Sequence, residues 1–276
     1  MAAMTEVSMK LTDEHLETFH EQGYVVVEDF YPESQWQEIV AEVRAQLPSW
    51  NQIRYVAPDA GRGKADFPYE EQFFNRLTLD EELINFVGRV LGTEDLHFRY
   101  AHNWVRYPQK DRPDDPPLHR DNGNNSLLPV NGVWKYGQIS TWYFPEDVGP
   151  DNAPMRIVPR QYGDDVSKCN YLTVGGNTQM IFNTHIWHGP TTYRGDEGQR
   201  YTVTRIYGRA DHYWEGVSSY TNMGSVPHFQ EFIGMLTARE REYFRFPPAG
   251  HEFYTAETLG LLEEQYPGWN ARGEYT

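Results

Sequence analysis

Cysteine is almost missing from this sequence, which has Cys169 alone among its 276 residues. A single thiol excludes both an intrachain disulfide framework and a thiolate metal cluster. A long apolar run is also missing. Residues 169–193 contain no Asp, Glu, Lys or Arg, but they include Gly, Pro, Asn and His, so they do not resemble a membrane span. Residues 1–10 have no apolar signal core, and we therefore expect a soluble, cytoplasmic protein.

Basic residues are scarce. The 24 Lys and Arg residues stand against 40 Asp and Glu residues, which gives a formal net charge of −16 and a pI near 5.0. Such an acidic protein repels phosphate backbones, so a nucleic acid is not an expected partner. An anionic ligand would therefore have to bind at a local group of basic side chains that differs from the overall negative charge.

Aromatic residues, Pro and Gly are plentiful by contrast. The aromatic content of 15%, with 18 Pro and 23 Gly, favours a β-rich fold with many turns over a helical bundle. Short runs of β-branched and aromatic residues predict strands. These runs cover residues 24–27, 96–107, 137–144, 155–158, 179–185 and 201–207.

Helical periodicity is confined to the two ends of the chain. Apolar stripes predict helices that start after Thr12 and stop at Gly23, and others at 32–47, 80–91, 226–236 and 256–266. We therefore expect one domain over residues 1–276, built around a β sandwich or barrel. It would have a helical shoulder at about 11–95, a β core at about 96–210 and a helical tail at about 211–276. The tail is either a cover for the core or a dimer element.

One short motif has the residue types of a metal site. In the run His119-Arg120-Asp121, an extended backbone would point His119 and Asp121 to the same face, two residues apart. An imidazole and a carboxylate in that arrangement, joined by a second histidine, form the facial triad of non-haem iron enzymes. His185 and His188 are both candidates for that second histidine, and their strand parity differs, so a regular strand would present only one of them.

Arg200 and Thr202 share strand parity further along the chain. A buried arginine beside a hydroxyl group suits a carboxylate, which it binds by a bidentate pair and one more hydrogen bond. Spacing alone favours another interpretation, in which Arg200 lies on the surface and pairs with Asp196 or Glu197.

Four landmarks in order make the chain similar to the phytanoyl-CoA dioxygenase family of Fe(II)- and 2-oxoglutarate-dependent oxygenases. They are the helix–strand opening at 11–27, the run His119-Arg120-Asp121, the segments 142–144 and 151–159, and Trp187-His188-Gly189 followed by Arg200. The resemblance implies mainly β structure with flanking helices around a double-stranded β-helix of the jelly-roll or cupin type. Two departures from the family pattern are Arg160-Gln161-Tyr162 in place of Gly-Ser-His and a slightly longer interval from His188 to Arg200, for which Arg205 is the fallback.

The resemblance also assigns roles. His119, Asp121 and His188 would bind Fe(II), and Arg200 with Thr202 would bind the distal carboxylate of 2-oxoglutarate. Trp142 and Asn103 would line that co-substrate.

The substrate pocket is expected from strand parity and from proximity to the metal motif. Its candidate residues are Trp104, Arg106, Asn122, Trp134 and Tyr207. Arg106, Arg156 and Lys135 would suit an anionic group, although surface ion pairs explain them equally well.

The implied activity is an oxidation that uses Fe(II), 2-oxoglutarate and O2 and releases succinate and CO2. Related halogenases have a small residue at the position of Asp121, so its carboxylate favours hydroxylation or another oxidation. We expect hydroxylation of an unactivated C–H bond in a small organic metabolite. Two alternatives remain open from the sequence. One is a non-catalytic binding protein on the same fold, and the other is a cupin-type metalloenzyme that does not use 2-oxoglutarate.

Overall fold

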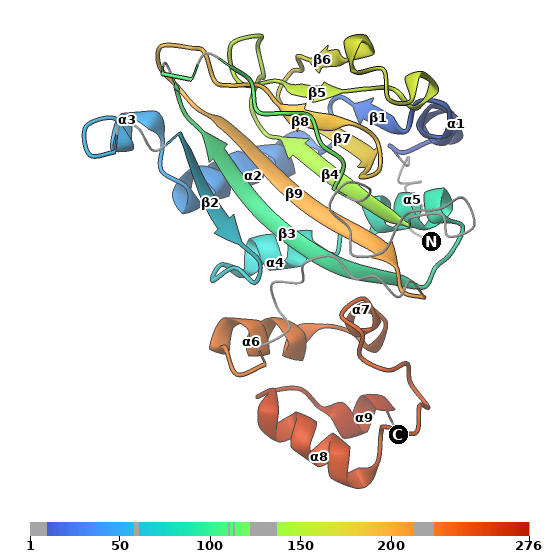
Figure 1. Ribbon diagram of the computed structural model, residues 1–276. Coiled ribbons are helices and arrows are strands. Elements are labelled where there is room, and N and C mark those ends of the chain that lie inside the picture. The colour runs from blue at the N-terminus through green and yellow to red at the C-terminus, as the bar shows by residue number, and fades with distance from the viewer. Residues whose placement is uncertain are drawn as a thin grey trace, which may run out of the picture.

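The protein is described here by a computed structural model that covers residues 10–57, 61–109, 111–112, 114–121, 137–211 and 224–275. Helices form the two ends and strands form the middle (Figure 1). The N-terminal helices are α1 (Asp13–Gln22), α2 (Glu33–Gln46), α3 (Trp50–Ile53), α4 (Gln72–Leu77) and α5 (Glu81–Leu91). The C-terminal helices are α6 (Pro227–Met235), α7 (Ala238–Glu242), α8 (Ala256–Gln265) and α9 (Ala271–Tyr275).

The strands form two antiparallel sheets. The larger sheet has the order β1-β7-β4-β9-β3-β2, with bounds Tyr24–Val27, Thr178–Asn183, Gln138–Phe144, Arg200–Arg209, Leu96–Arg106 and Arg62–Asp66. The smaller sheet has the order β6-β5-β8, with bounds Asn170–Leu172, Met155–Ile157 and His188–Pro190. The fold is therefore mainly antiparallel β structure with helices, as the sequence predicted at this coarse level.

The first helix shows how closely local signals set the element boundaries. Thr12 caps α1 in a capping box, in which its hydroxyl accepts from the backbone N–H of His15 and the His15 ring accepts from the Thr12 N–H. Gly23 ends the helix in the left-handed conformation, with φ of 80°. The other expected helices and strands are also present, with ends shifted by a residue or two.

The two faces of the large sheet have different neighbours. One face carries Tyr143, Ile181 and Val203, which belong to the same apolar cluster as residues of α2, α4 and α5. In Figure 1, α2 lies behind the large sheet. The other face contributes Phe144, Met180 and Phe182 to a second cluster with Met155 and Ile157 of the small sheet. Because side chains alternate along a strand, only the second face can supply residues to a site between the two sheets.

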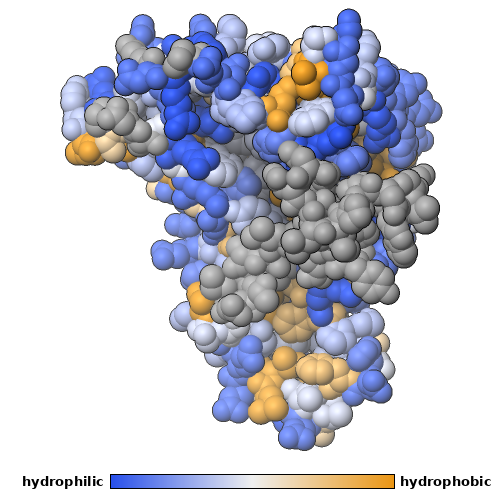
Figure 2. All heavy atoms as spheres, in the orientation of Figure 1, coloured by the Kyte–Doolittle hydropathy of each residue, from blue (hydrophilic) through white to orange (hydrophobic). Residues whose placement is uncertain are grey.

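The C-terminal helices pack on the β core through aromatic rings. Phe67 contacts Phe229, Phe232 and Phe244 with ring centroids 5.7–6.0 Å apart, and Phe98 of β3 lies 5.3 Å from Phe244. The surface in Figure 2 is largely hydrophilic, with apolar patches among the helices at the bottom. Within the part of the chain that the structure describes, no helix combines the length and the apolar character needed to cross a membrane.

Candidate metal centre

Main-chain hydrogen bonds bring the two halves of the predicted triad together. His119 and His188 form a reciprocal antiparallel bridge, in which each backbone N–H donates to the carbonyl of the other at 2.9 and 3.0 Å. The N–H of Asp121 donates to the carbonyl of Thr184 at 3.1 Å. The segment around His119 is therefore extended along the start of β8, and His119 and Asp121 point to the same side, as the sequence predicted.

The three side chains form a compact donor set. Asp121 Oδ1 lies 3.5 Å from His119 Nε2, and Asp121 Oδ2 lies 3.6 Å from His188 Nε2. The donor atoms all lie within 4.8 Å of one another. The exposed fraction is 3% for the His188 side chain, 35% for Asp121 and 42% for His119, so the set is closed on one side and open on the other. Two imidazoles and one carboxylate are the donors of a mononuclear site with free coordination positions.

A hydrogen bond holds the His188 ring in the orientation that a metal needs. His188 Nδ1 donates to the carbonyl of Ile186 at 2.8 Å, which leaves the lone pair on Nε2. A ring hydrogen bond of this kind fixes the tautomer of a metal-binding histidine. Burial acts to raise the pKa of Asp121, but when His119 and His188 are protonated their hydrogen bonds and charge outweigh it and hold that pKa below its usual range. Asp121 is therefore a carboxylate at neutral pH.

The two candidate histidines lie in different places relative to Asp121. His185 lies in the turn between β7 and β8, where its backbone N–H donates to Asn183 Oδ1. The donor set includes His188 and does not include His185. The turn breaks the strand pattern, so parity alone would not have decided this point.

Arg200 and Thr202 begin β9 on the face that looks toward the small sheet. Arg200 is only 2% exposed, so the surface interpretation of this residue is wrong. Its Nε and Nη1 have no hydrogen-bond partner among the described residues, and neither does the buried hydroxyl of Thr202. Burial, together with the charge of Arg106, holds the pKa of Arg200 well below its usual value. A buried guanidinium whose donors have no hydrogen-bond partner among the described residues suits an anionic ligand.

Trp142 lies on the same face as Thr202. It stands on β4, across from Thr204, and its ring centroid is 6.0 Å from that of Phe182. Phe182 in turn lies 4.7 Å from the ring of His188, so aromatic contacts join Trp142 to the donor set.

Asn103 is a correction to the expected set. It pairs with Val203 in the register, so it faces the helices and not the small sheet. There its Nδ2 donates to Gln46 Oε1 at 2.6 Å, and its Oδ1 accepts from the Tyr69 hydroxyl at 3.3 Å. Asn103 is thus a buried structural amide, and it does not line the site.

The same alternation sorts the expected substrate residues. Trp104 pairs with Thr202 and Arg106 pairs with Arg200, so both lie on the site face. Tyr207 lies on the opposite face, fully buried, where its hydroxyl donates to the carbonyl of Thr78 at 2.7 Å, and this assignment is corrected. Asn122, Trp134 and Lys135 lie outside the described residues.

Two other arginines have structural partners. Arg205, the fallback for Arg200, faces the helices and donates to Tyr31 Oη, Leu77 O and Gln179 Oε1 at 3.0–3.4 Å. Arg156 lies 3.8 Å from Asp115 and donates to the carbonyls of Pro116 and Pro190. The ion-pair interpretation therefore applies to Arg156.

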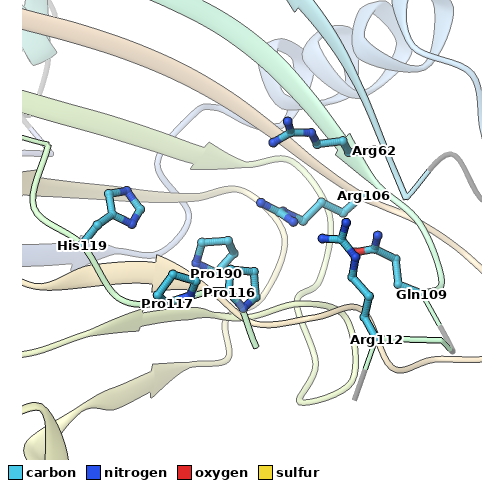
Figure 3. A pocket seen from close by; sticks show the side chains of 8 residues that line it. All are labelled: Arg62, Arg106, Gln109, Arg112, Pro116, Pro117, His119 and Pro190. Atoms are coloured by element: carbon cyan, nitrogen blue, oxygen red, sulfur yellow. The ribbon is translucent and has the colours of Figure 1, made fainter. Parts of the chain in front are cut away.

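A pocket of about 530 Å³ extends from His119 (Figure 3). Prolines line its middle, and Figure 3 shows a group of basic and amide side chains at the end away from His119. The lining residues are Arg62, Arg106, Gln109, Arg112, Pro116, Pro117, His119 and Pro190. Sequence reasoning found His119 and Arg106 but missed the others, because Arg62 reaches this place only through the pairing of β2 with β3.

Comparisons with solved structures agree on the fold. HygX from Streptomyces hygroscopicus, with nickel, 2-oxoglutarate and hygromycin B bound, is 18% identical with a TM-score of 0.55, over 73% of this chain and 88% of that one. EctD from S. alaskensis with bound Fe is 13% identical with a TM-score of 0.56, over 77% and 82%. The non-haem α-ketoglutarate-dependent epimerase SnoN from nogalamycin biosynthesis is 15% identical with a TM-score of 0.53, over 72% and 82%.

No curated protein matches the chain in sequence. A family model does match it. The phytanoyl-CoA dioxygenase (PhyH) model covers residues 19–167, a little more than half of the chain, and that range includes His119 and Asp121. The chain therefore belongs to the phytanoyl-CoA dioxygenase family.

Proposed function

We propose that this protein is an Fe(II)- and 2-oxoglutarate-dependent dioxygenase that hydroxylates an unactivated C–H bond of a small organic metabolite. The single observation that supports this most is the donor set of His119, Asp121 and His188, whose donor atoms lie within 4.8 Å of one another. Iron bound there would supply the oxidation of the substrate by O2, coupled to conversion of 2-oxoglutarate to succinate and CO2. The remaining chemistry consists of binding, orientation and exclusion of water by the side chains of this chain.

In this proposal Arg200 and Thr202 bind the distal carboxylate of 2-oxoglutarate. The support is their fit to that group: a buried guanidinium with two unpartnered nitrogens and a buried hydroxyl on one face of β9. A carboxylate would satisfy both donors and neutralise the buried charge. Trp142 would line the same region through its contacts with Phe182.

The side chains around the metal would each have a defined task. His188, buried and bonded to Ile186 O, would be the fixed ligand, while the more exposed His119 and Asp121 would leave room for the reactants. Pro116, Pro117 and Pro190 would keep the wall of the pocket rigid and free of N–H donors that attract water. A rigid, dry wall limits turnover without substrate.

We also propose that the β core is a double-stranded β-helix and that residues 1–276 form a single domain. Two antiparallel sheets with an apolar cluster between them, and the metal donors at the edge of the smaller one, support the first point. The aromatic contacts between the C-terminal helices and Phe67 support the second.

The test is substrate-stimulated release of succinate from the purified protein with Fe(II), 2-oxoglutarate and O2, screened over a collection of small metabolites. We expect His119→Ala to abolish release and to lose bound iron. His185→Ala is the matched control, because it removes a nearby histidine that does not belong to the donor set, and it is expected to retain both. Undiminished turnover in His119→Ala would overturn the ligand assignment.

The product distinguishes hydroxylation from the other outcomes of such an oxidation. The similar structures include an epimerase and a carbocyclase, so inversion of a centre and ring closure are the alternatives to test. Mass spectrometry of the product separates them, because hydroxylation adds one oxygen atom, cyclisation removes two hydrogen atoms and epimerisation leaves the mass unchanged. The proposal of a hydroxylase stands only if the oxygen atom is found.

A further inference from the structure

A row of arginines crosses the large sheet beside the candidate metal centre. Arg62 of β2 pairs with Arg106 of β3, and Arg106 pairs with Arg200 of β9, so the three side chains lie on one face in register. Arg112, in the segment after β3, points to the same place. Figure 3 shows Arg62, Arg106 and Arg112 gathered at the end of the pocket opposite His119.

Over the described ranges of the chain, these guanidinium groups differ from several other arginines in having no carboxylate partner. Arg44 pairs with Glu146, and Arg194 pairs with Asp115 at 2.8 Å. Among the described residues, none forms an ion pair with Arg62, Arg106 or Arg112. This is unusual in a protein with 40 acidic and 24 basic residues, where a carboxylate is easily found.

The three neighbouring positive charges also destabilise one another when no anion lies between them. Burial and the charges of Arg62 and Arg112 lower the pKa of Arg106 to about 10. Arg62 also lies over the Trp104 ring, 5.1 Å from its centroid, but this contact relieves neither the burial of Arg106 nor the repulsion among the three guanidinium groups. An anion between the three groups would relieve both, because each guanidinium can donate two parallel hydrogen bonds to an oxyanion.

The distal carboxylate of 2-oxoglutarate does not account for the cluster. That group is satisfied by one guanidinium and one hydroxyl, which Arg200 and Thr202 supply. Arg62 and Arg112 are exposed at the mouth of the pocket, whereas Arg200 is buried and does not line it. Three positive charges at a mouth that is open to solvent match a ligand that enters from outside and carries more than one negative charge.

We propose that Arg62, Arg106 and Arg112 form an anion site, separate from Arg200, that binds a dianionic oxyanion group of the substrate. With that group held at the mouth, the rest of the substrate extends past the prolines toward His119, where the C–H bond is oxidised. The inference rests on the proposed function for the reaction but not for the binding. Phosphate esters and dicarboxylates both have the required chemistry, and the experiment uses one probe for each.

The experiment measures anion binding by calorimetry on the full chain, at saturating 2-oxoglutarate with Mn(II) in place of iron. The probes are inorganic phosphate and malonate, and the variants are Arg106→Gln and the double variant Arg62→Gln, Arg112→Gln. Arg44→Gln is the matched control, because it removes an arginine that already has a carboxylate partner. The double variant changes exposed side chains only, so its folding is not in question.

We expect the wild type and Arg44→Gln to bind one of the probes, and both cluster variants to bind it about tenfold to a hundredfold more weakly. If phosphate binds more tightly, the substrate class is phosphate esters. If malonate binds more tightly, the substrate class is dicarboxylates. Equal binding in the cluster variants, or no binding of either probe, overturns the inference. The inference is also overturned if 2-oxoglutarate displaces the probe and Arg106→Gln weakens the binding of 2-oxoglutarate itself.

The failure of this inference and that of the proposed function are distinguishable. If succinate release depends on His119 but neither probe binds through the cluster, the anion site is wrong and the oxygenase stands. If the probes bind through the cluster but iron and 2-oxoglutarate produce no succinate with any substrate, the anion site stands and the oxygenase is wrong.

Discussion

Replacement of Arg200 by Met separates a ligand-binding arginine from a structural one, because the two roles predict opposite effects on stability. The side chain is 2% exposed, and its Nε and Nη1 have no hydrogen-bond partner among the described residues. Each buried polar group left without a partner costs about 1–3 kcal/mol. Methionine is flexible enough to fill the same space and has no donors to satisfy.

The magnitude follows from these two nitrogens. Removing them stabilises the ligand-free protein by about 2–6 kcal/mol. Losing the packing of the side chain and its contact with the Phe144 ring at 5.7 Å destabilises it by about 1–3 kcal/mol. The middle of each range gives a net rise of about 2 kcal/mol in the free energy of unfolding of the ligand-free Arg200→Met protein. The affinity for 2-oxoglutarate falls at the same time by about 2–5 kcal/mol, or about 30-fold to 5,000-fold.

Urea unfolding of the ligand-free protein and anaerobic calorimetry with 2-oxoglutarate and metal measure the two effects. Arg205→Met is the matched control, since Arg205 is equally buried but donates to Tyr31, Leu77 and Gln179. We expect it to lose about 3–5 kcal/mol of stability, because those acceptors lose their partner. The reasoning is refuted if Arg200→Met is destabilised as much as Arg205→Met and its folded form binds 2-oxoglutarate as tightly as the wild type.

Three further predictions address the site and the fold. Thr202→Val removes a buried hydroxyl that has no hydrogen-bond partner among the described residues. We expect a fivefold to tenfold weaker affinity for 2-oxoglutarate, roughly the effect of one hydrogen bond, with no loss of thermal stability; a clear drop in melting temperature would contradict this. Burial, with the charges of Arg99 and Arg245, lowers the pKa of His97 to about 4, so the unfolded chain binds the proton first as the pH falls from 6.5. Stability should drop by on the order of 2–3 kcal/mol between pH 6.5 and 4, and His97→Gln should flatten that part of the urea-unfolding profile; an unchanged slope would refute it. Gly23→Ala places a Cβ 3.0 Å from Ile186 at a φ of 80°, and should cost about 1–2 kcal/mol in urea unfolding; wild-type stability would contradict it.

The sequence predicts elements well where apolar side chains repeat with the period of the element. The segments 96–107 and 137–144 are found as β3 and β4, because their aromatic and β-branched residues are buried on both faces. The strand β2 was not expected, because its sequence Arg62-Gly63-Lys64-Ala65-Asp66 has almost no apolar residue. It is an edge strand, whose position is set by hydrogen bonds to β3 and not by burial of its own side chains.

The candidate site shows the same division. The shared side of His119 and Asp121 follows from their spacing of two residues, which can be read from the sequence. The structure brings the two side chains together as expected. The placement of Asn103 and Tyr207 depends on which face of a long strand is directed toward the small sheet. The register with a strand distant in the sequence decides this. Arg200 has acidic neighbours in the chain that suggest an exposed ion pair, yet tertiary packing buries it. The cluster of Arg62 and Arg112 is formed only by the fold.

The reciprocal bridge between His119 and His188 has a consequence for the engineering of this protein. The positions of all three donors are fixed by main-chain hydrogen bonds, from His119 and His188 to each other and from Asp121 to Thr184. The backbone frame therefore does not depend on which side chains it carries. New donor groups at these three positions, such as Cys or Glu, would start from the same backbone spacing, and the length of each side chain would then set where its donor atom lies, which makes the site a scaffold for artificial metalloenzymes.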